Sequence, residues 1–178
     1  MLRLYDSLDW VVWLLTHAAL ALCVLLFGLS TILLAAEIVG RYLFNHPFQN
    51  VAETVTIAFI YVFMIGAAAL YSRNEDIALD YFFIRTGAKV QAVWLLLIFL
   101  AIAVTMTVVT TATIQLIQIQ GNVRTPSLRL PLGVEHAALA VAAAMIAFTS
   151  LVDALGCLIW IVSGRRPARR IAGPVNPA

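Results

Sequence analysis

The stretch Arg41-Tyr42-Leu43-Phe44-Asn45-His46-Pro47, followed by Glu53, decides how this chain folds. It is a polar hinge in a chain that is otherwise largely apolar. An apolar run reaches Glu37 and Arg41, which lie one helical turn apart, and Pro47 then stops helical propagation. A second apolar run starts just after Glu53. Charged residues where two membrane helices meet are costly to retain, so we expect this hinge to have a role.

The composition of the chain excludes a soluble domain. Its 178 residues are 63% hydrophobic and 11% charged, and the mean hydropathy is +0.98. Ordinary domains are about 45–50% apolar and about 25% charged. The length suffices for a small helical bundle but not for two membrane domains. The net charge is only +2, and no basic run is interleaved with aromatic residues, so nucleic acid is excluded as a partner.

Four apolar segments predict an all-α membrane protein. They cover residues 10–39, 51–71, 90–119 and 132–162. Each exceeds the roughly 20 residues that cross a hydrocarbon core of about 30 Å. Three of them approach about 45 Å at about 1.5 Å per residue, so the helices must tilt or protrude. We therefore expect one domain of four long tilted transmembrane helices over residues 1–164 and a basic, disordered tail over residues 165–178. The first segment is too long for a signal-peptide core, so we expect it to be retained.

Arginine and lysine residues predict the orientation of these helices. Four crossings put both termini on one side, which carries eight of the eleven cations; the opposite side carries Arg41, Arg124 and Arg129. Because positive residues favour the cytoplasm, we expect both termini to be cytoplasmic, with the hinge and residues 121–131 outside. The tail arginines then either anchor the chain in the cytoplasm or bind anionic membrane lipid; they are Arg165, Arg166, Arg169 and Arg170.

Few residues could carry chemistry inside the membrane. Asp153 is the main acidic candidate, but it lies only seven residues before Trp160, close to the cytoplasmic face. This position favours a structural hydrogen bond or ion pair over proton coupling. The third segment is rich in hydroxyl groups, which either satisfy backbone carbonyls and pack against helices or line an ion path. These hydroxyls belong to Thr105, Thr107, Thr110, Thr111 and Thr113. The fourth segment is rich in alanine, which permits close packing within the chain or against a larger partner.

Cofactor, metal and catalytic sites are not expected. His17 lies near the cytoplasmic face, whereas His46 and His136 lie near the outer face, so no bis-histidine haem site is predicted. Cys23 and Cys157 both lie inside apolar runs, which is typical of buried small hydrophobic residues. The chain has no GxxxxGK[ST] phosphate loop, HExxH zinc pair or GxSxG nucleophile elbow. It is therefore not expected to be an enzyme.

The hinge resembles that of the small membrane subunit of TRAP transporters, the tripartite ATP-independent periplasmic uptake systems. Members often show an Arg-Tyr-x-Phe-Asn-x-Pro run, then a Trp and paired acids that open the second helix. The matching residues here are Arg41, Tyr42, Phe44, Asn45 and Pro47, with Glu53 at the second acidic position. Asn50 and Ala52 replace the usual Trp and the first acid.

Later motifs extend the resemblance over about residues 5–162. The family's Gly-Ala-Ala step is matched by residues 66–68. Its next loop usually reads Arg, then His-Ile and an Asp; here it reads Arg73, Asp76-Ile77 and Asp80, with Asp76 in place of the His. The segment Thr125-Pro126-Ser127-Leu128-Arg129-Leu130-Pro131 resembles the family's Thr-Pro-x-Leu-x-x-Pro.

The resemblance implies a subunit of a secondary transporter in the bacterial inner membrane. A large multi-helix subunit would carry the substrate and sodium, and a soluble periplasmic protein would capture an organic acid. The small subunit would scaffold the large one and help to dock the binding protein without carrying substrate itself.

Roles for individual residues follow as expectations. Arg41 pairs with Glu37 in the same helix, with Glu53 across the hinge, or with another chain. Tyr42 belongs to the same hinge motif, and Asn45 and Pro47 shape the turn. Arg73 and Asp80 either hold the cytoplasmic loop against the large subunit or are solvated. Arg124 and Arg129 are the candidates for docking an acidic soluble partner.

Two other classes of function fit a four-helix membrane protein. A membrane anchor of a respiratory complex predicts haem- or quinone-linked absorbance and a redox subunit that co-purifies. A small autonomous proton-coupled exporter predicts transport by the purified chain that depends on Asp153 or Glu37.

Overall fold

Four long helices make up the part of the chain that the computed structural model describes, which is residues 2–43, 50–73, 88–121, 123–125 and 127–163. They are α1 (Leu2–Leu43), α2 (Val51–Arg73), α3 (Ala88–Ile119) and α4 (Gly133–Ser163). All four are long and apolar enough to cross a membrane. The prediction of an all-helical protein with four membrane-length helices is therefore confirmed.

The first helix is longer than its apolar run. It begins at Leu2 and continues to Leu43, so it extends beyond residues 10–39 at both ends. Arg41 and Tyr42 consequently lie in its last turn rather than after it. At about 1.5 Å per residue the helix measures about 63 Å, roughly twice the thickness of a hydrocarbon core.

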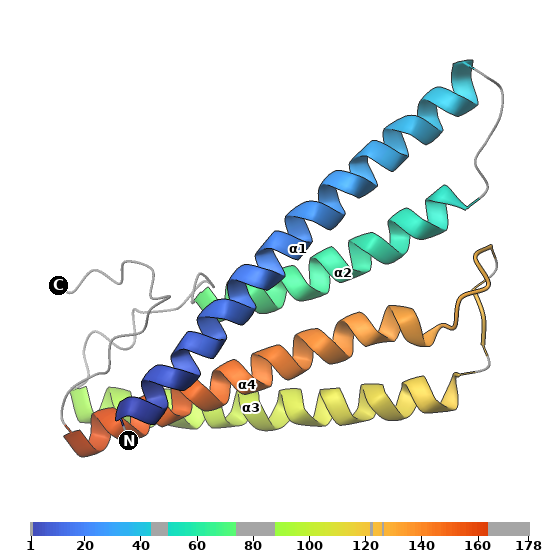
Figure 1. Cartoon of the computed structure of the whole chain (residues 1–178). Coiled ribbons are helices and arrows are strands. Elements are labelled where there is room, and N and C mark those ends of the chain that lie inside the picture. The colour runs from blue at the N-terminus through green and yellow to red at the C-terminus, as the bar shows by residue number, and fades with distance from the viewer. Residues whose placement is uncertain (1, 44–49, 74–87, 122, 126, 164–178) are drawn as a thin grey trace.

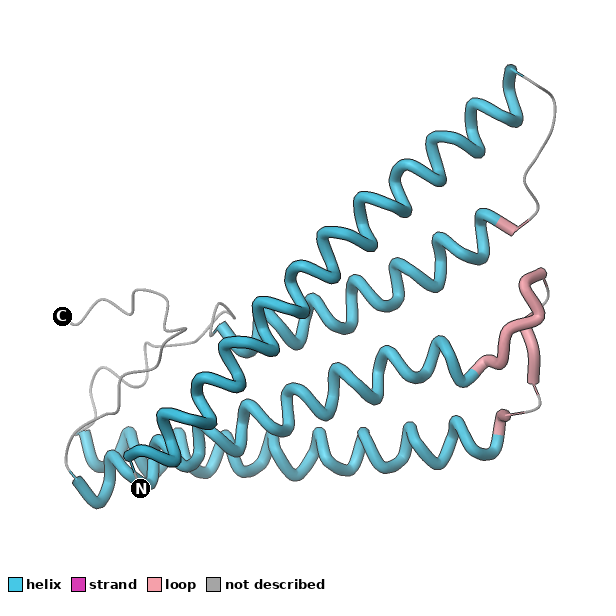
Figure 2. The backbone as a smooth tube through the Cα atoms, viewed as in Figure 1, coloured by secondary structure: helices cyan, strands magenta, loops and turns pink. Residues whose placement is uncertain are grey.

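The helices form an open array rather than a closed bundle. At the end of the array away from the N-terminus they follow one another in the order α1, α2, α4, α3 in Figures 1 and 2, whereas toward the N-terminus α1 crosses over α2. Both described chain ends lie at the same end of the array. Neighbours in this order pack against each other, and α1 also contacts α4. Within the described residues, α3 contacts α4 and no other helix. Sequence order and spatial order therefore differ, because α4 inserts between α2 and α3.

Helix α4 is the central element. In its most apolar 18-residue window 44% of residues are buried, against 11% in that of α3. The buried alanines of α4 let its neighbours approach closely; they are Ala138, Ala142, Ala143, Ala147 and Ala154. Packing within the chain accounts for these five alanines, whereas Ala144 of the same helix is exposed.

A narrow stripe along α1 makes its contacts with the other helices. The buried positions alternate at spacings of four and three, as in a heptad seam; they are Tyr5, Asp9, Val12, Thr16, Ala19 and Cys23. Val12 and Tyr5 pack with Val152 of α4, while Ala19 and Cys23 pack with Ile65 and Ala69 of α2. Most of the remaining surface of α1 is exposed, which suits a helix at the edge of an array in lipid.

The threonines of α3 satisfy backbone carbonyls of their own helix. Each hydroxyl donates to a carbonyl three or four residues earlier, at distances of 2.7–2.9 Å. A hydroxyl bonded in this way is compatible with lipid or with an apolar neighbour. The geometry therefore favours the packing explanation over an ion path.

Candidate functional site

The glutamate and the arginine at the end of α1 pair with each other. Arg41 donates from Nη2 to Glu37 Oε1, one turn earlier in the same helix. The Glu37 side chain is 8% exposed and that of Arg41 is 58% exposed. Of the two partners considered within the chain, the structure thus places Glu37 against Arg41. Tyr42, in the same turn, is 82% exposed and available for contact with lipid or protein.

Glu53 instead joins α2 to the segment between α3 and α4. Its Oε2 accepts the backbone N–H of Ser127 at 2.9 Å and that of Leu128 at 2.8 Å. The other oxygen, Oε1, is buried and has no hydrogen-bond partner among the described residues. The Ser127 hydroxyl also bonds to Asn50 Oδ1 at 2.6 Å. These contacts form a latch, by which we mean Asn50 and Glu53 on one side and Ser127 and Leu128 on the other.

The start of α2 explains why Glu53 reaches this position. The Asn50 carbonyl accepts the Thr54 N–H at 3.1 Å, so Asn50 occupies the N-cap position and Glu53 is the third residue of the helix. An acid in the first turn is favoured by the helix dipole. In a capping box this residue would turn back to its own cap. Here it reaches across to another loop.

The segment that receives Glu53 is a short antiparallel hairpin, called here the α3–α4 loop (residues 120–132). Thr125 N–H donates to the Leu130 carbonyl at 2.8 Å, and Leu132 N–H donates to the Val123 carbonyl at 2.9 Å. Thr125 Oγ1 accepts the Leu130 N–H at 3.1 Å. The described residues of this loop lie at the end of the array opposite the N-terminus (Figure 2).

Two arginines are presented by this loop. Arg124 and Arg129 are both exposed, and Arg124 Nη1 donates to the Arg129 carbonyl at 3.4 Å. Arg129 has a φ of 53°, in the left-handed region that non-glycine residues seldom adopt. A guanidinium group matches a carboxylate geometrically and can bind it through two parallel hydrogen bonds. The loop can therefore offer two cations to an acidic surface.

A second set of polar contacts joins α2 to α4. Ser72 donates its one hydroxyl hydrogen to the Ala68 carbonyl at 3.0 Å, so in its 3.0 Å contact with Thr149 the threonine is the donor. Ser150 likewise donates to the Ile146 carbonyl, so Tyr71 donates to Ser150 at 2.8 Å. Residues 71–72 and 149–150 thus form a hydroxyl seam between the two helices.

Tyr61 adds a further bond between α2 and α4. Its hydroxyl donates to the Val134 carbonyl at 2.8 Å. Together with the latch and the hydroxyl seam, this contact joins α2 to α4 and to the α3–α4 loop at several levels along the helix axis. The α2–α4 boundary is therefore fixed by directional bonds as well as by packing.

The ionisable groups within the helices do not assemble a reaction centre among the described residues. Asp153 is 7% exposed on α4, and Asp9 is 2% exposed on the buried stripe of α1. His17 Nδ1 lies 2.8 Å from the Trp13 carbonyl, whereas His136 Nε2 lies 2.9 Å from Gln120 Oε1. Within the described ranges, no group of three or more His, Cys, Asp or Glu residues could hold a metal ion.

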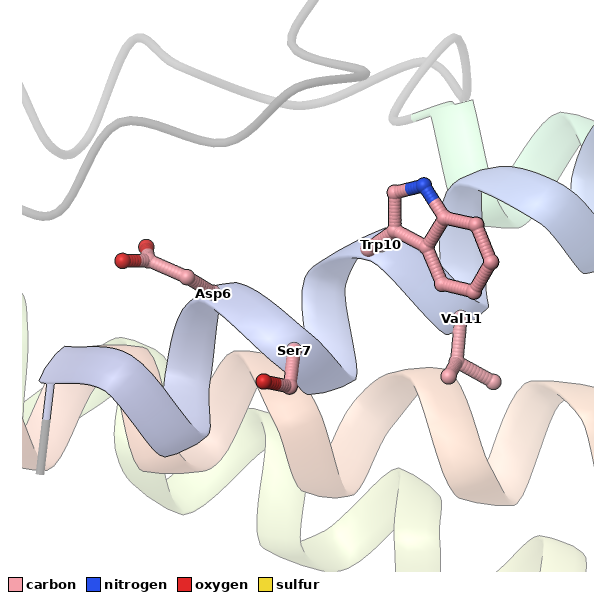
Figure 3. Close-up of a pocket in the computed structure, with 4 residues that line it drawn as sticks. All are labelled: Asp6, Ser7, Trp10 and Val11. Carbon is pink, nitrogen blue, oxygen red and sulfur yellow. The ribbon is translucent and has the colours of Figure 1, made fainter.

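A cavity beside the start of α1 does not resemble a substrate site. It has a volume of about 490 Å³ and is lined by Asp6, Ser7, Trp10 and Val11. Figure 3 shows these four side chains fanning out from one helix instead of converging on a point. Substrate sites usually combine an apolar hollow with several convergent polar groups.

The structure brings together some of the predicted site residues and leaves others apart. Glu37 and Arg41 form one group. A second, separate group contains Glu53 and the loop that carries Arg124 and Arg129. Arg73 is the last residue of α2. Asn45, Pro47 and Asp80 lie outside the described residues, as does the tail over residues 165–178.

Sequence reasoning missed the latch partners and the hydroxyl seam. Asn50 was noted only as a departure from a family pattern, although Asn three residues before Glu is a helix-start signal. The adjacent hydroxyls of Tyr71-Ser72, at the end of the second apolar run, and of Thr149-Ser150, inside the fourth, were the signal for the seam. The heptad spacing of Asp9 relative to Tyr5 and Thr16 could have indicated that Asp9 lies on the buried stripe of α1.

The chain matches the model of a known family. The family model described as "Tripartite ATP-independent periplasmic transporters, DctQ component" matches residues 30–159. The matched range includes the end of α1, all of α2 and α3, the latch, and nearly all of α4. No curated protein matches the chain.

Proposed function

Because the chain belongs to the DctQ family of tripartite ATP-independent periplasmic transporters, we propose that it braces the large transport subunit in the bilayer and helps to dock the periplasmic binding protein. In this proposal the large subunit moves an organic acid with sodium, and this chain carries no substrate. The family is one of transporter subunits rather than enzymes. This assignment favours the proposal over the respiratory anchor and the autonomous exporter that the sequence alone left open.

The exposure of Arg124 and Arg129 on a hydrogen-bonded loop is the observation that carries the docking role. Loops held in one conformation lose less entropy on binding than mobile ones. Paired cations on such a loop favour an acidic partner and speed its approach at low ionic strength. We place this loop on the periplasmic side, in agreement with the distribution of arginine and lysine along the chain.

Charge reversal tests the docking role. The double substitution Arg124→Glu and Arg129→Glu should weaken binding of the periplasmic protein to the assembled membrane complex at least tenfold and lower uptake accordingly. Gln115→Glu with Gln118→Glu is the matched control, because both glutamines are exposed near the same end of α3. Unchanged binding by the arginine double variant would discard the docking role.

The orientation and the bracing role need separate tests. Reporter fusions should place the hinge in the periplasm and the C-terminus in the cytoplasm. Purification under mild detergent should recover a large multi-helix membrane protein with this chain. Recovery of a redox enzyme instead would contradict the proposal.

A further inference from the structure

Glu53 and the two amides that it binds are the starting point. Its Oε2 accepts N–H groups from residues 74 and 75 positions later in the chain, Ser127 and Leu128. Consecutive backbone N–H groups that converge on one point form a concavity suited to an anion. In this molecule the anion is the chain's own carboxylate, supplied by a different helix.

We propose that Glu53 is a positioning residue: its carboxylate holds the α3–α4 loop in the conformation that presents Arg124 and Arg129. This inference rests on the docking role proposed above and deepens it. Glu53 itself makes no contact with the partner in this scheme. It acts through the loop from α2, whereas the loop itself connects α3 to α4.

The loop needs such a hold because its own conformation is unfavourable. Arg129 lies in the left-handed region at a φ of 53°. The hairpin bonds of Thr125 and Val123 join the two arms of the loop to each other. They do not connect the loop to α2. The bonds from Ser127 and Leu128 to Glu53 supply that connection, and charge-assisted bonds of this kind are about twice as strong as neutral ones.

The position of Glu53 is itself fixed, which makes it an effective anchor. Asn50 occupies the N-cap position of α2, and Tyr61 ties the same helix to the first turn of α4. Asn50 also contacts the Ser127 hydroxyl, so it could share the holding role. The Asn50→Ala variant separates the two contributions, because it removes the hydroxyl contact and keeps the carboxylate.

Hydrogen–deuterium exchange on the full chain in lipid nanodiscs tests the proposal. Glu53→Met keeps the length of the side chain and removes its acceptors. It should speed exchange of the Ser127 and Leu128 amides by about tenfold to a hundredfold, the scale expected for losing bonds to a charged acceptor. Glu53→Gln keeps one neutral acceptor oxygen and should restore part of the protection. Exchange within α2 and α4 should not change. Faster exchange in these helices would indicate a general loss of structure and not a release of the loop alone.

The matched control is Glu135→Gln, which removes an acid from the first turn of α4. It should leave the loop amides as in the wild type, and Asn50→Ala should have an effect several-fold smaller than Glu53→Met. Wild-type exchange of the loop in Glu53→Met would overturn the proposal. If that variant does not assemble, Glu53→Gln decides: unchanged protection there would show that the carboxylate is not needed.

A binding measurement connects the loop to its role and distinguishes the two proposals. Glu53→Met should weaken binding of the periplasmic protein, but it should add nothing to the Arg124→Glu/Arg129→Glu variant, because residues that act through one element are not additive. An additive loss would contradict action through the loop. Normal binding by the arginine variant, together with fast loop exchange in Glu53→Met, would remove the docking role and leave Glu53 as the anchor of the loop.

Discussion

Arg41 pairs with Glu37 one turn earlier in α1, and the two side chains differ greatly in exposure, at 58% for the arginine and 8% for the glutamate. Removing the arginine leaves a nearly buried carboxylate without its cation, whereas removing the glutamate leaves a cation that water can reach. We expect Arg41→Gln to destabilise the chain by about 1–3 kcal/mol. Glu37→Gln should destabilise it by less than about 1 kcal/mol.

Unfolding by a denaturing detergent measures this asymmetry, and the double variant Arg41→Gln/Glu37→Gln is the control. The double variant should recover most of the stability lost in Arg41→Gln. Equal losses from the two single variants would contradict the prediction.

Transport lost on reversing the charge of Arg41 or of Glu53 alone should not be restored by reversing both, because Glu53 binds the α3–α4 loop and not Arg41.

The hydroxyl seam predicts a coupling between α2 and α4. Thr149→Val removes the donor to Ser72 and should destabilise the chain by about 0.6 kcal/mol, and by no more than about 1.7 kcal/mol. Thr149→Ser keeps the donor and should have a smaller effect. A double-mutant cycle with Ser72→Ala measures the coupling. A coupling energy near zero would show that packing alone holds these residues together.

Two glycines of similar chemistry should respond oppositely to alanine. A Cβ at Gly156 would lie 3.1 Å from Tyr5 Cε2 and 3.3 Å from Tyr5 Oη, whereas nothing lies within 4 Å of a Cβ at Gly28. Tyr5 is only 4% exposed and has little room to move. Gly156→Ala should therefore cost about 1–3 kcal/mol, and Gly28→Ala should be neutral or stabilise by up to about 1 kcal/mol.

Thermal unfolding in detergent compares these two variants. Disulfide trapping between cysteines placed on α1 and α4 adds a direct readout of the α1–α4 contact. Trapping should slow in Gly156→Ala and stay unchanged in Gly28→Ala. A stable Gly156→Ala variant with normal trapping would argue against the close contact with Tyr5.

The threonines of α3 should be dispensable for transport. Thr105 and Thr111 are exposed, and their hydroxyls donate to Ala101 and Val108 of the same helix. Valine has nearly the same shape and needs no hydrogen-bond partner. The double variant Thr105→Val/Thr111→Val should therefore take up substrate at the wild-type rate in the assembled transporter. A loss of uptake at normal expression would support the ion-path explanation instead.

The sequence predicted the number of helices because an apolar run of membrane length leaves few alternatives. It predicted the start of α1 less well, since the residues before Trp10 are not apolar enough to extend the run and are helical through packing at Tyr5 and Asp9. The partner of Glu53 could not be predicted, because the contact joins residues 74 positions apart and uses backbone amides that any sequence would supply. The side of the membrane on which the termini lie stays a prediction from the arginine and lysine distribution.

The row of helices has a geometric consequence for a chain of this size. A closed bundle of four helices turns one side of each helix inward, so its perimeter, seen along the helix axes, is short. Here α1 contacts both α2 and α4, whereas α3 contacts only α4 within the described residues, so most of the surface of α3 is left open. A chain arranged in this way leaves more helix surface open to lateral contact than a closed bundle of equal mass does.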